Sequence, residues 1–346
     1  MYQRCLFVLC SMIAGALLVL ASSSAWASCG SANCFLVTGT QEKVNVPGQM
    51  TVDLSYRYIP LDVFHDGASK TNQAITPGID FAAGTIVPNH HSEIRTINEM
   101  LQVDASYGVT ERLTLQIALP LINNRLHEHI HDPAPPNPAG PGANEFESLS
   151  VSGLGDIRLL AKYALVVSTK HLLVIGGGVK APSGEYKLLG GDGEILEPTL
   201  MPGTGSWDAL FSLFYDYQLI PHQFDAFVSG SYQYTTRNDL DYEFADQVLL
   251  NAGVSYLLAQ FEGGRTVSTS LQVNSRLTAF PIHDQYKGMN VPSTGGVWVY
   301  LTPGVRVQAS NNLGLYTFFQ YPLYQYVNEV NLVPRYGLVL GASYAF

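Results

Sequence analysis

Apolar and polar residues alternate strictly along many short segments of the chain. From Met50 to Tyr58, for example, every second residue is apolar, and the residues between them include Thr51, Asp53 and Arg57. A period of two residues is that of a β-strand with one apolar face and one polar face. The pattern therefore predicts strands whose two faces meet environments of opposite polarity.

Twelve such segments follow one another along the chain. They span residues 50–58, 97–108, 112–123, 155–165, 171–181, 206–218, 224–234, 246–258, 266–277, 297–308, 313–322 and 335–346. Short connections such as Gly108–Glu111 and Ala309–Asn312 alternate with long ones. An even number of strands, with short turns at one end and long loops at the other, is typical of a bacterial outer-membrane barrel whose apolar face meets lipid. A soluble β-sandwich could carry the same alternation, but it has no reason to sort its connections by length.

We therefore predict an all-β fold, a transmembrane antiparallel up-and-down β-barrel of about 12 strands. The first residues have the composition of an export signal, because an apolar run over residues 6–21 precedes the small-residue site Ala25-Trp26-Ala27. We predict a cleaved signal peptide over 1–27, a periplasmic N-terminal segment or partial plug over 28–49, and the outer-membrane barrel over 50–346. The expected location is the bacterial outer membrane.

Composition agrees with this class and excludes another. Only 13% of the residues are charged, and the formal net charge is −10, so the chain offers no basic surface for a nucleic-acid partner. The 32 glycines and 20 tyrosines suit strands, turns and amphipathic aromatic positions. Two cysteines, Cys29 and Cys34, follow the predicted signal peptide, and an oxidising periplasm favours a disulfide between them.

Aromatic residues gather near the ends of the predicted strands. Trp207 and Tyr217 lie at the two ends of one apolar face, and Tyr56 and Tyr58 lie at the end of another. This placement is typical of the girdles that barrels present to outer-membrane lipid. The last strand alternates up to Phe346 and looks like the signal through which the barrel assembly machinery recognises its substrates. Lipid and that machinery are the expected partners, together with a small-molecule solute.

Charged residues on the polar faces are expected to line the lumen. They are Asp53, Arg57, Asp104, Asp156, Arg158, Lys162, Lys180, Asp208, Asp216, Arg276, Arg306 and Arg335. Such a lining could steer polar solutes through a pore, or its charges could pair across strands and fill a narrow barrel. Twelve strands enclose a lumen of intermediate width, so both alternatives stay open, and a channel is the leading hypothesis.

Histidines are concentrated in the long predicted loops. The candidate metal ligands are His90, His91, His127, His129 and His131. The last three alternate, so an extended chain would place their imidazoles on one side, and imidazole with carboxylate suits a divalent metal such as Zn, Cu, Ni or Fe. The alternative is that polar loops tolerate histidine freely, and no other cofactor is expected. Acidic residues of two long predicted loops are interpreted as solvated or divalent-cation-bridging surface charges rather than as specific ligands. These are Glu145, Glu147, Asp192, Glu194 and Glu197.

No arrangement of residues indicates catalysis. Ser206 near Asp208 comes closest to an activated nucleophile, but no histidine is predicted beside them. Gly176-Gly177-Gly178 lacks the strand-to-helix context of a phosphate-binding loop. We therefore expect no enzyme and assign no catalytic residues.

Several short motifs occur in a characteristic order. They are Tyr107-Gly108-Val109-Thr110-Glu111-Arg112-Leu113, Ser152-Gly153-Leu154-Gly155-Asp156-Ile157-Arg158, Lys180-Ala181-Pro182-Ser183-Gly184, Pro202-Gly203-Thr204-Gly205-Ser206-Trp207-Asp208 and Tyr321-Pro322-Leu323. The chain resembles the family of outer-membrane transporters named for the meta-pathway of phenol degradation, which is similar in outline to the fatty-acid transporter barrels. The resemblance implies a channel for passive uptake or efflux of small hydrophobic or aromatic solutes. A metal-binding receptor or transporter that uses the histidine-rich loops, and a purely structural barrel, are the alternatives.

Overall fold

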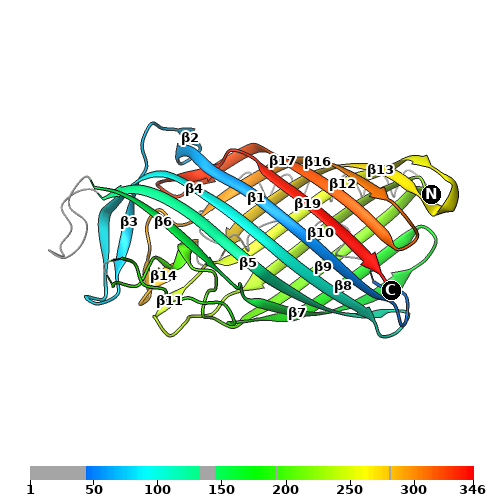
Figure 1. Ribbon diagram of the computed structural model, residues 1–346, viewed down its shortest axis with the longest axis horizontal. Helices are drawn as coiled ribbons and strands as arrows, with labels where there is room; N and C mark the ends of the chain where they lie inside the picture. Colours follow the sequence, from blue (N-terminus) through cyan, green and yellow to red (C-terminus); the bar gives the residue numbers. More distant parts are fainter. Residues whose placement is uncertain (1–43, 132–144, 192, 280–281) are drawn as a thin grey trace, which may run out of the picture.

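Twelve long antiparallel strands form a closed barrel in the computed structural model, which describes residues 44–131, 145–191, 193–279 and 282–346 (Figure 1). The strands are β1 (Met50–Asp66), β4 (Thr85–Gly108), β5 (Leu113–His131), β7 (Ile157–Val167), β8 (His171–Ala181), β9 (Asp208–Ile220), β10 (Phe224–Tyr234), β12 (Asp246–Gln260), β13 (Thr266–Ala279), β16 (Gly296–Gln308), β17 (Leu313–Val327) and β19 (Gly337–Ala345). The predicted fold class, an all-β barrel of twelve strands, is confirmed.

Strand β1 closes the barrel, because it pairs with both β4 and β19. Thr51 is opposite Ser106 on one side and opposite Ala345 on the other. Each of the other long strands pairs with the long strands on either side of it. The ring of twelve long strands therefore has no free edge, so each of these strands has a hydrogen-bonded neighbour on both sides.

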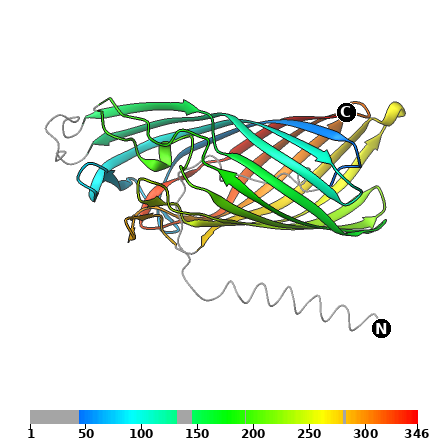
Figure 2. The ribbon, with the colours of Figure 1, turned by 90° about the horizontal axis from the view of Figure 1, so that it is seen from below.

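The two ends of the barrel differ, as the alternating connections predict. Short turns and the C-terminus lie at the right of Figure 1, and we name this the turn end. The long connections gather at the opposite end, the loop end, in both views (Figures 1 and 2).

Short strands and one short helical turn give the loop end a structure of its own. The strands there are β2 (Ser69–Lys70), β3 (Ile75–Asp80), β6 (Phe146–Gly153), β11 (Tyr242–Glu243), β14 (Gln285–Tyr286), β15 (Met289–Asn290) and β18 (Val330–Pro334). Strands β11, β14 and β15 form a small separate sheet. Within the described ranges the helical segments are the 3-10 turns η3 (Pro198–Leu200), at the loop end, and η4 (Glu262–Gly264), at the turn end, and no helix there is long and apolar enough to cross a membrane.

The outward faces of the strands carry an apolar belt of the kind that a barrel presents to lipid. On β1 the belt covers Met50–Tyr58, and a tilted strand needs roughly 9–11 residues to cross a bilayer. Outward-facing ion pairs bound the belt on the loop side. Arg95 binds Glu128 at 2.7 Å, and Arg335 binds Asp62 at 2.9 Å. The ends of β4 and β5 beyond these pairs therefore lie outside the membrane-spanning segments.

The inward faces are polar and connected across strands. Gln102 and Gln116 donate to the two carboxylate oxygens of Asp104, at 2.7 and 3.0 Å. Tyr316 on β17 donates to Asp53 Oδ1 on β1 at 2.6 Å, across β19. An apolar outside and a polar inside are the reverse of a soluble β-sandwich, and they explain the alternation in the sequence.

The predicted signal peptide lies outside the described residues, and so do residues 28–43 of the predicted N-terminal segment, which include Cys29 and Cys34. From Val44 onward the chain runs along the turn end of the barrel. The Asn45 amide donates to Thr114 Oγ1 at 2.8 Å, and Val44 packs against the inward cluster that includes Phe214. Strand β1 then begins at Met50, as predicted.

Candidate functional site

Three sequence segments meet at a buried ion cluster inside the wall. Lys180 on β8 places Nζ 2.6 Å from Asp208 Oδ2 on β9 and 3.3 Å from Asp156 Oδ2. None of these side chains is more than 1% exposed. Lys180 also donates to the hydroxyls of Thr204 and Ser206. Because a buried charge is tolerated only when it is paired, these residues must stay together, and we name this group the lysine clamp.

The lysine clamp holds the two ends of the β8–β9 connection, residues 182–207, which we name the inner loop. Asp156 Oδ1 accepts the amide of Gly184 at 3.0 Å, and Oδ2 accepts the amide of Thr204 at 2.9 Å. Gly184 and Gly203 are in backbone contact there, and a Cβ on Gly203 would lie 2.5 Å from the Gly184 carbonyl carbon. Only glycine permits so close an approach. The sequence motifs that contain Asp156, Lys180 and Thr204 thus meet at the lysine clamp.

The inner loop turns into the barrel and packs on the inner face of β5. Asn123 Nδ2 donates to the Pro202 carbonyl at 2.7 Å. Arg125 Nη1 donates to the carbonyls of Leu200, at 3.1 Å, and Met201, at 2.5 Å. Leu200 and Met201 are buried. The inner loop is therefore part of the barrel interior.

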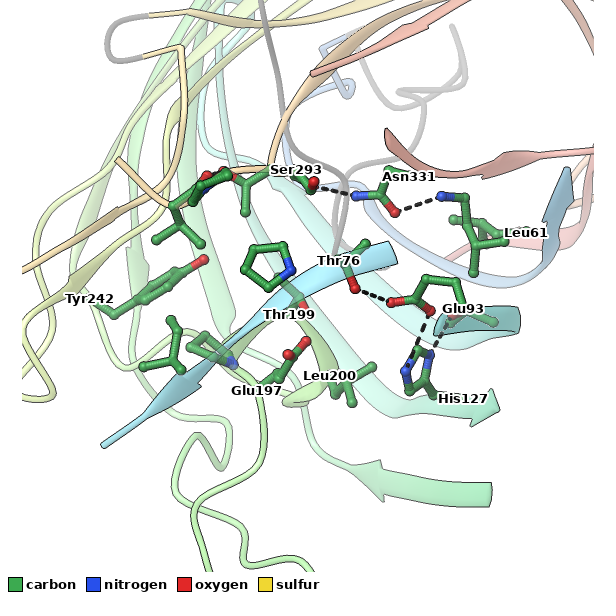
Figure 3. A pocket seen from close by; sticks show the side chains of 18 of the residues that line it. Leu61, Thr76, Glu93, His127, Glu197, Thr199, Leu200, Tyr242, Ser293 and Asn331 are labelled. Carbon is green, nitrogen blue, oxygen red and sulfur yellow. Dashed lines mark hydrogen bonds and ion pairs between the residues drawn. The ribbon is translucent and has the colours of Figure 1, made fainter. Parts of the chain in front are cut away.

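Two further connections, residues 235–245 and 282–296, cover the loop end beside the inner loop. Tyr242 donates to Asp284 at 2.7 Å, and its ring packs in a buried cluster with Tyr286. A cavity of about 70 Å³ lies between these connections, the inner loop and the wall (Figure 3). Thr76 donates to Glu93 at 2.7 Å at its edge. The described part of the loop end is thus largely filled.

A larger cavity of about 290 Å³ lies in the lumen toward the turn end. Three phenylalanines line it, Phe214 on β9, Phe227 on β10 and Phe318 on β17. Asp216 and Arg306 share the same cavity. The interior therefore contains an aromatic patch within a polar lining.

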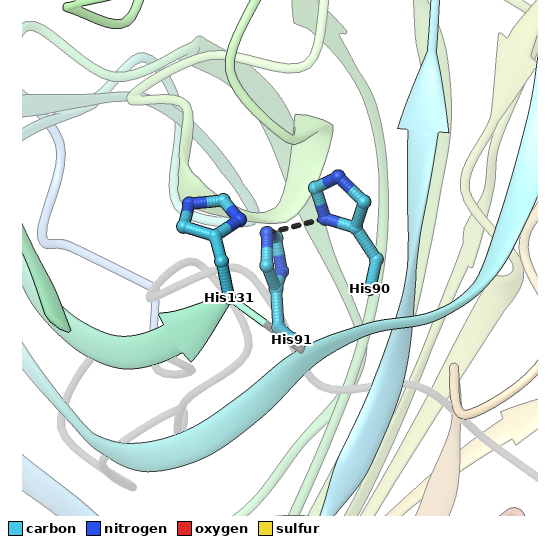
Figure 4. Close-up of side chains that lie close together, drawn as sticks. All are labelled: His90, His91 and His131. Carbon is cyan, nitrogen blue, oxygen red and sulfur yellow. Dashed lines mark hydrogen bonds between the residues drawn. The ribbon is translucent and has the colours of Figure 1, made fainter. Parts of the chain in front are cut away.

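Five histidines gather inside the wall at the loop end, and we name them the imidazole cluster. They are His90, His91, His127, His129 and His131. The register of β4 and β5 places His91 opposite His131, and alternation points His127, His129 and His131 inward. The ring centroids of His91 and His129 are 4.0 Å apart, and His91 lies between His90 and His131 (Figure 4).

The sequence predicted that these histidines lie in loops, and this was wrong. They lie on β4 and β5, because the pairing of these strands continues past the apolar belt. The inner loop and its neighbours cover the inward side of that extension. An extended strand with a covered inner face is why His129 is only 1% exposed.

Glu147 on β6 borders the imidazole cluster closely. Its Oε2 lies 2.6 Å from His131 Nε2 and 3.4 Å from His129 Nε2. The hydrogen bond from His129 lowers the pKa of Glu147 to about 2. This carboxylate is therefore ionised at neutral pH and lies against two imidazole rings.

Two more carboxylates face the cluster. Glu197 Oε1 of the inner loop lies 3.2 Å from His91 Nδ1, and Glu93 Oε2 lies 3.6 Å from His127 Nε2. The interpretation of Glu147 and Glu197 as solvated surface charges was wrong, because folding of the inner loop and pairing of β6 with β5 bring them to the histidines. Glu145 is exposed and Glu194 is half-buried, and Asp192 lies outside the described residues.

Burial keeps three imidazoles of the cluster, those of His90, His127 and His131, neutral near neutral pH. It lowers the pKa of His127 to about 3 and that of His90 to about 4. It also lowers the pKa of His131. Neutral imidazoles beside an ionised carboxylate are the protonation states in which these groups bind cations.

Most of the charged lumen candidates lie inside the barrel wall. Those with buried side chains are Asp53, Arg57, Asp104, Asp156, Lys162, Lys180, Asp208, Asp216 and Arg276. Arg158 and Arg306 are half-buried and line internal cavities. The structure brings Asp156, Lys180 and Asp208 together in the lysine clamp, whereas the others are distributed around the wall.

The prediction that Arg335 faces the lumen was wrong. Its side chain is 60% exposed and pairs with Asp62. The chain bends between β18 and β19 at this position, so the alternation of β19 does not extend to Arg335.

Sequence reasoning missed the lumen phenylalanines and the anchoring role of Arg125. Phe214 shares the polar face of its strand with Asp208 and Asp216, and an aromatic residue on a polar face is the signal that could have revealed it. Arg125 lies past the predicted end of its strand, so no alternation indicated its direction.

Comparisons with known proteins place the chain in a family. A family profile described as "putative MetA-pathway of phenol degradation" matches residues 69–323. The crystal structure of an outer-membrane channel from Pseudomonas putida F1 superposes with a TM-score of 0.59 at 14% identity, covering 90% of this chain and 100% of that one. No curated protein sequence matches.

Two other solved structures are similar at lower scores. A Pseudomonas aeruginosa FadL homologue has a TM-score of 0.42 at 11% identity, covering 93% of this chain and 99% of that one. The Pseudomonas putida toluene transporter TodX has a TM-score of 0.43 at 12% identity, covering 93% and 95%. Because the family profile covers most of the chain, and the motifs that form the lysine clamp fall within the match, the protein belongs to the family described as "putative MetA-pathway of phenol degradation".

Proposed function

We propose that the protein is an outer-membrane channel that passes small aromatic or hydrophobic solutes passively. Family membership, the apolar belt and the polar interior support a membrane channel. With the short turns on the periplasmic side, the loop end faces outward, as in other bacterial barrels. The lumen cavity with its three phenylalanines is the observation that supports aromatic or hydrophobic molecules as the solutes.

The size and lining of this cavity suit one aromatic ring with polar substituents. Its volume of about 290 Å³ exceeds the roughly 150 Å³ of an apolar cavity that holds benzene. Phe214 and Phe227 have ring centroids 6.1 Å apart, within the range of favourable aromatic contacts. Asp216, Gln272 and Arg306 offer hydrogen bonds to a hydroxyl or carboxyl group. A phenol or an aromatic acid matches both properties.

The filled loop end sets the expected conductance. The inner loop and two neighbouring connections line a cavity of about 70 Å³ at the loop end. A solute must pass a constriction whose position depends on the inner loop. We therefore expect small ionic currents and selection by solute size.

The test is conductance of the purified protein in a planar bilayer, with matched aromatic and saturated solutes. Benzoate and cyclohexanecarboxylate have the same charge and similar size, so a difference in how strongly they block the current shows the effect of the aromatic ring. We expect benzoate to block the current at lower concentration. No current, or equal block by both solutes, would refute the proposed function.

Matched variants locate the effect in the cavity. Phe227→Leu and Phe318→Leu remove lumen aromatic rings, whereas Phe211→Leu changes a ring that is 54% exposed on the outer face. An aromatic contact contributes about 0.5–1.5 kcal/mol, so each lumen variant should weaken benzoate block by about two- to tenfold. Phe211→Leu should leave the block unchanged.

A further inference from the structure

We propose that His129, His131 and Glu147 form a binding site for one divalent transition-metal ion, with Zn²⁺ as the ion that fits best. The site lies in the wall at the loop end, apart from the lumen cavity that carries the proposed function. It therefore adds a ligand to the protein, and its test does not depend on channel activity.

The spacing of the three candidate ligand atoms carries the proposal. His129 Nε2 and His131 Nε2 are 3.2 Å apart, and Glu147 Oε2 lies 2.6 Å from the second and 3.4 Å from the first. Ligands about 2.0–2.1 Å from a tetrahedral zinc ion are about 3.3 Å from one another. The three atoms thus already form a triangle close to one face of a zinc coordination tetrahedron.

Hydrogen bonds alone do not satisfy all three of these atoms. If both rings carried Nε2–H, their two donors would lie 3.2 Å apart and share one acceptor, Glu147 Oε2, so hydrogen bonds cannot link all three atoms pairwise. A divalent cation accepts a lone pair from each of them at once. The arrangement therefore suits a metal ion better than a hydrogen-bonded network.

Neighbouring residues can complete the coordination. His91 and His90 form a further triad with His131, in which the candidate ligand atoms all lie within 4.8 Å of one another. His91 lies in the centre of the group (Figure 4). A candidate ligand atom of His91 lies within 4.8 Å of one on His131, so His91 is the neighbour placed to supply a fourth ligand. Three ligands with an available fourth position are typical of zinc sites.

The donor set and the charge select the class of ion. Two imidazole nitrogens and a carboxylate suit Zn, Co, Ni or Cu, whereas Mg and Ca prefer oxygen ligands throughout. Glu197, whose pKa is lowered to about 2, lies against His91 in the same cluster and adds a second negative charge to that of Glu147. A divalent cation would reduce the repulsion among these carboxylates.

The experiment is metal binding by the detergent-solubilised protein after chelation and dialysis. Calorimetric titration with Zn²⁺ measures affinity and stoichiometry, and the visible spectrum with Co²⁺ reports tetrahedral nitrogen and oxygen coordination. We expect saturable binding of Zn²⁺ in wild type that millimolar Mg²⁺ does not displace. Absence of saturable binding, or displacement by Mg²⁺, would overturn the proposal.

Variants assign the ion to these residues. H129A/H131A removes two ligands, and Glu147→Gln removes one with little change of shape. Each should raise the Kd for Zn²⁺ at least about tenfold, since even changes to residues that only hydrogen-bond metal ligands cost 10- to 100-fold in affinity. The side chain of His222 is exposed in the β9–β10 turn. His222→Gln is therefore the matched control and should bind Zn²⁺ as the wild type does. If H129A/H131A fails to fold, Glu147→Gln decides, and an unchanged Kd in Glu147→Gln would overturn the site.

Discussion

The ammonium group of Lys180 lies 2.6 Å from Oδ2 of Asp208, and neither side chain reaches solvent. The second carboxylate of the lysine clamp, Asp156, accepts amide hydrogens from both ends of the inner loop. Charge balance in the wall and the position of the inner loop therefore depend on the same residues. A change in either one should affect the other.

Replacing Lys180 with methionine should release the inner loop. Two buried carboxylates would lose their cation, and breaking a buried ion pair in this way costs about 3–5 kcal/mol. We expect a lower midpoint of urea unfolding and a larger conductance in planar bilayers. Lys187→Met is the control, because the Lys187–Asp239 pair is exposed to solvent and should contribute little to stability. Equal stability of the two variants would contradict the role of the lysine clamp.

Adding a methyl group at Gly203 should have a similar effect without any change of charge. Its Cβ would meet the Gly184 backbone at 2.5 Å, and backbone atoms cannot move aside as a flexible side chain can. We expect Gly203→Ala to cost about 1–3 kcal/mol and to raise conductance. At Gly191, in the same loop, a Cβ meets nothing within 4 Å, so Gly191→Ala should behave as wild type. A Gly203→Ala protein with wild-type unfolding and conductance would disagree with the contact.

Arg306 should control charge selectivity, because it shares the lumen cavity with Asp216 and Asp225. Arg306→Gln leaves the two carboxylates with less positive charge nearby, so permeating cations should be favoured. One unit charge at about 4 Å in water changes an ion's energy by about 1 kcal/mol, roughly a fivefold effect on permeability. The reversal potential across a KCl gradient measures this change. Arg112→Gln, at an exposed turn, is the control, and an equal shift in both variants would argue against a lumen effect.

Acid should loosen the loop end of the metal-free protein. Burial lowers the pKa of His127 to about 3 and that of His90 to about 4, from an ordinary value of 6.5. A histidine with a lowered folded pKa stabilises the fold fully above pH 6.5, and this contribution is lost as the pH falls toward the folded value. The pKa of Glu147 is about 2, against an ordinary 4.5, so its contribution is lost only below pH 4.5.

Hydrogen-exchange protection at residues 127–131 checks this expectation. We expect lower protection factors at pH 5 than at pH 7.5, with strand β13 unchanged as an internal reference. Equal protection of residues 127–131 at both pH values would show that proton binding and opening of the imidazole cluster are not linked.

The barrel could be predicted from the sequence because a membrane wall imposes the same alternation on every strand. Segments such as Met50–Tyr58 face lipid on one side and a polar lumen on the other, so period and polarity appear together. The extensions of β4 and β5 could not be predicted in this way. Beyond the belt no lipid selects apolar residues, and His127 to His131 therefore resemble loop residues although they pair as a strand.

The candidate site was only partly predictable for a different reason. Alternation correctly placed His127, His129 and His131 on one side of an extended chain. The approach of Glu197 depends on the inner loop, which folds through the contact of Gly184 with Gly203 and through hydrogen bonds to Asp156. Such contacts join residues that no local pattern relates, so the sequence indicated the ligand types without their grouping.

The pairing of β1 with β19 has a consequence for how the molecule is made. Every other junction in the wall joins strands that are close in sequence, whereas this one joins residues from opposite ends of the chain, such as Thr51 and Ala345. Loop-closure entropy opposes so distant a contact, which makes it a slow step of assembly. Until this pairing forms, the unpaired edges of β1 and β19 can form hydrogen bonds with strands of other polypeptides. A substitution that weakens the pairing of β1 with β19 should therefore cause aggregation and degradation during assembly. Molecules that have closed the barrel should function normally.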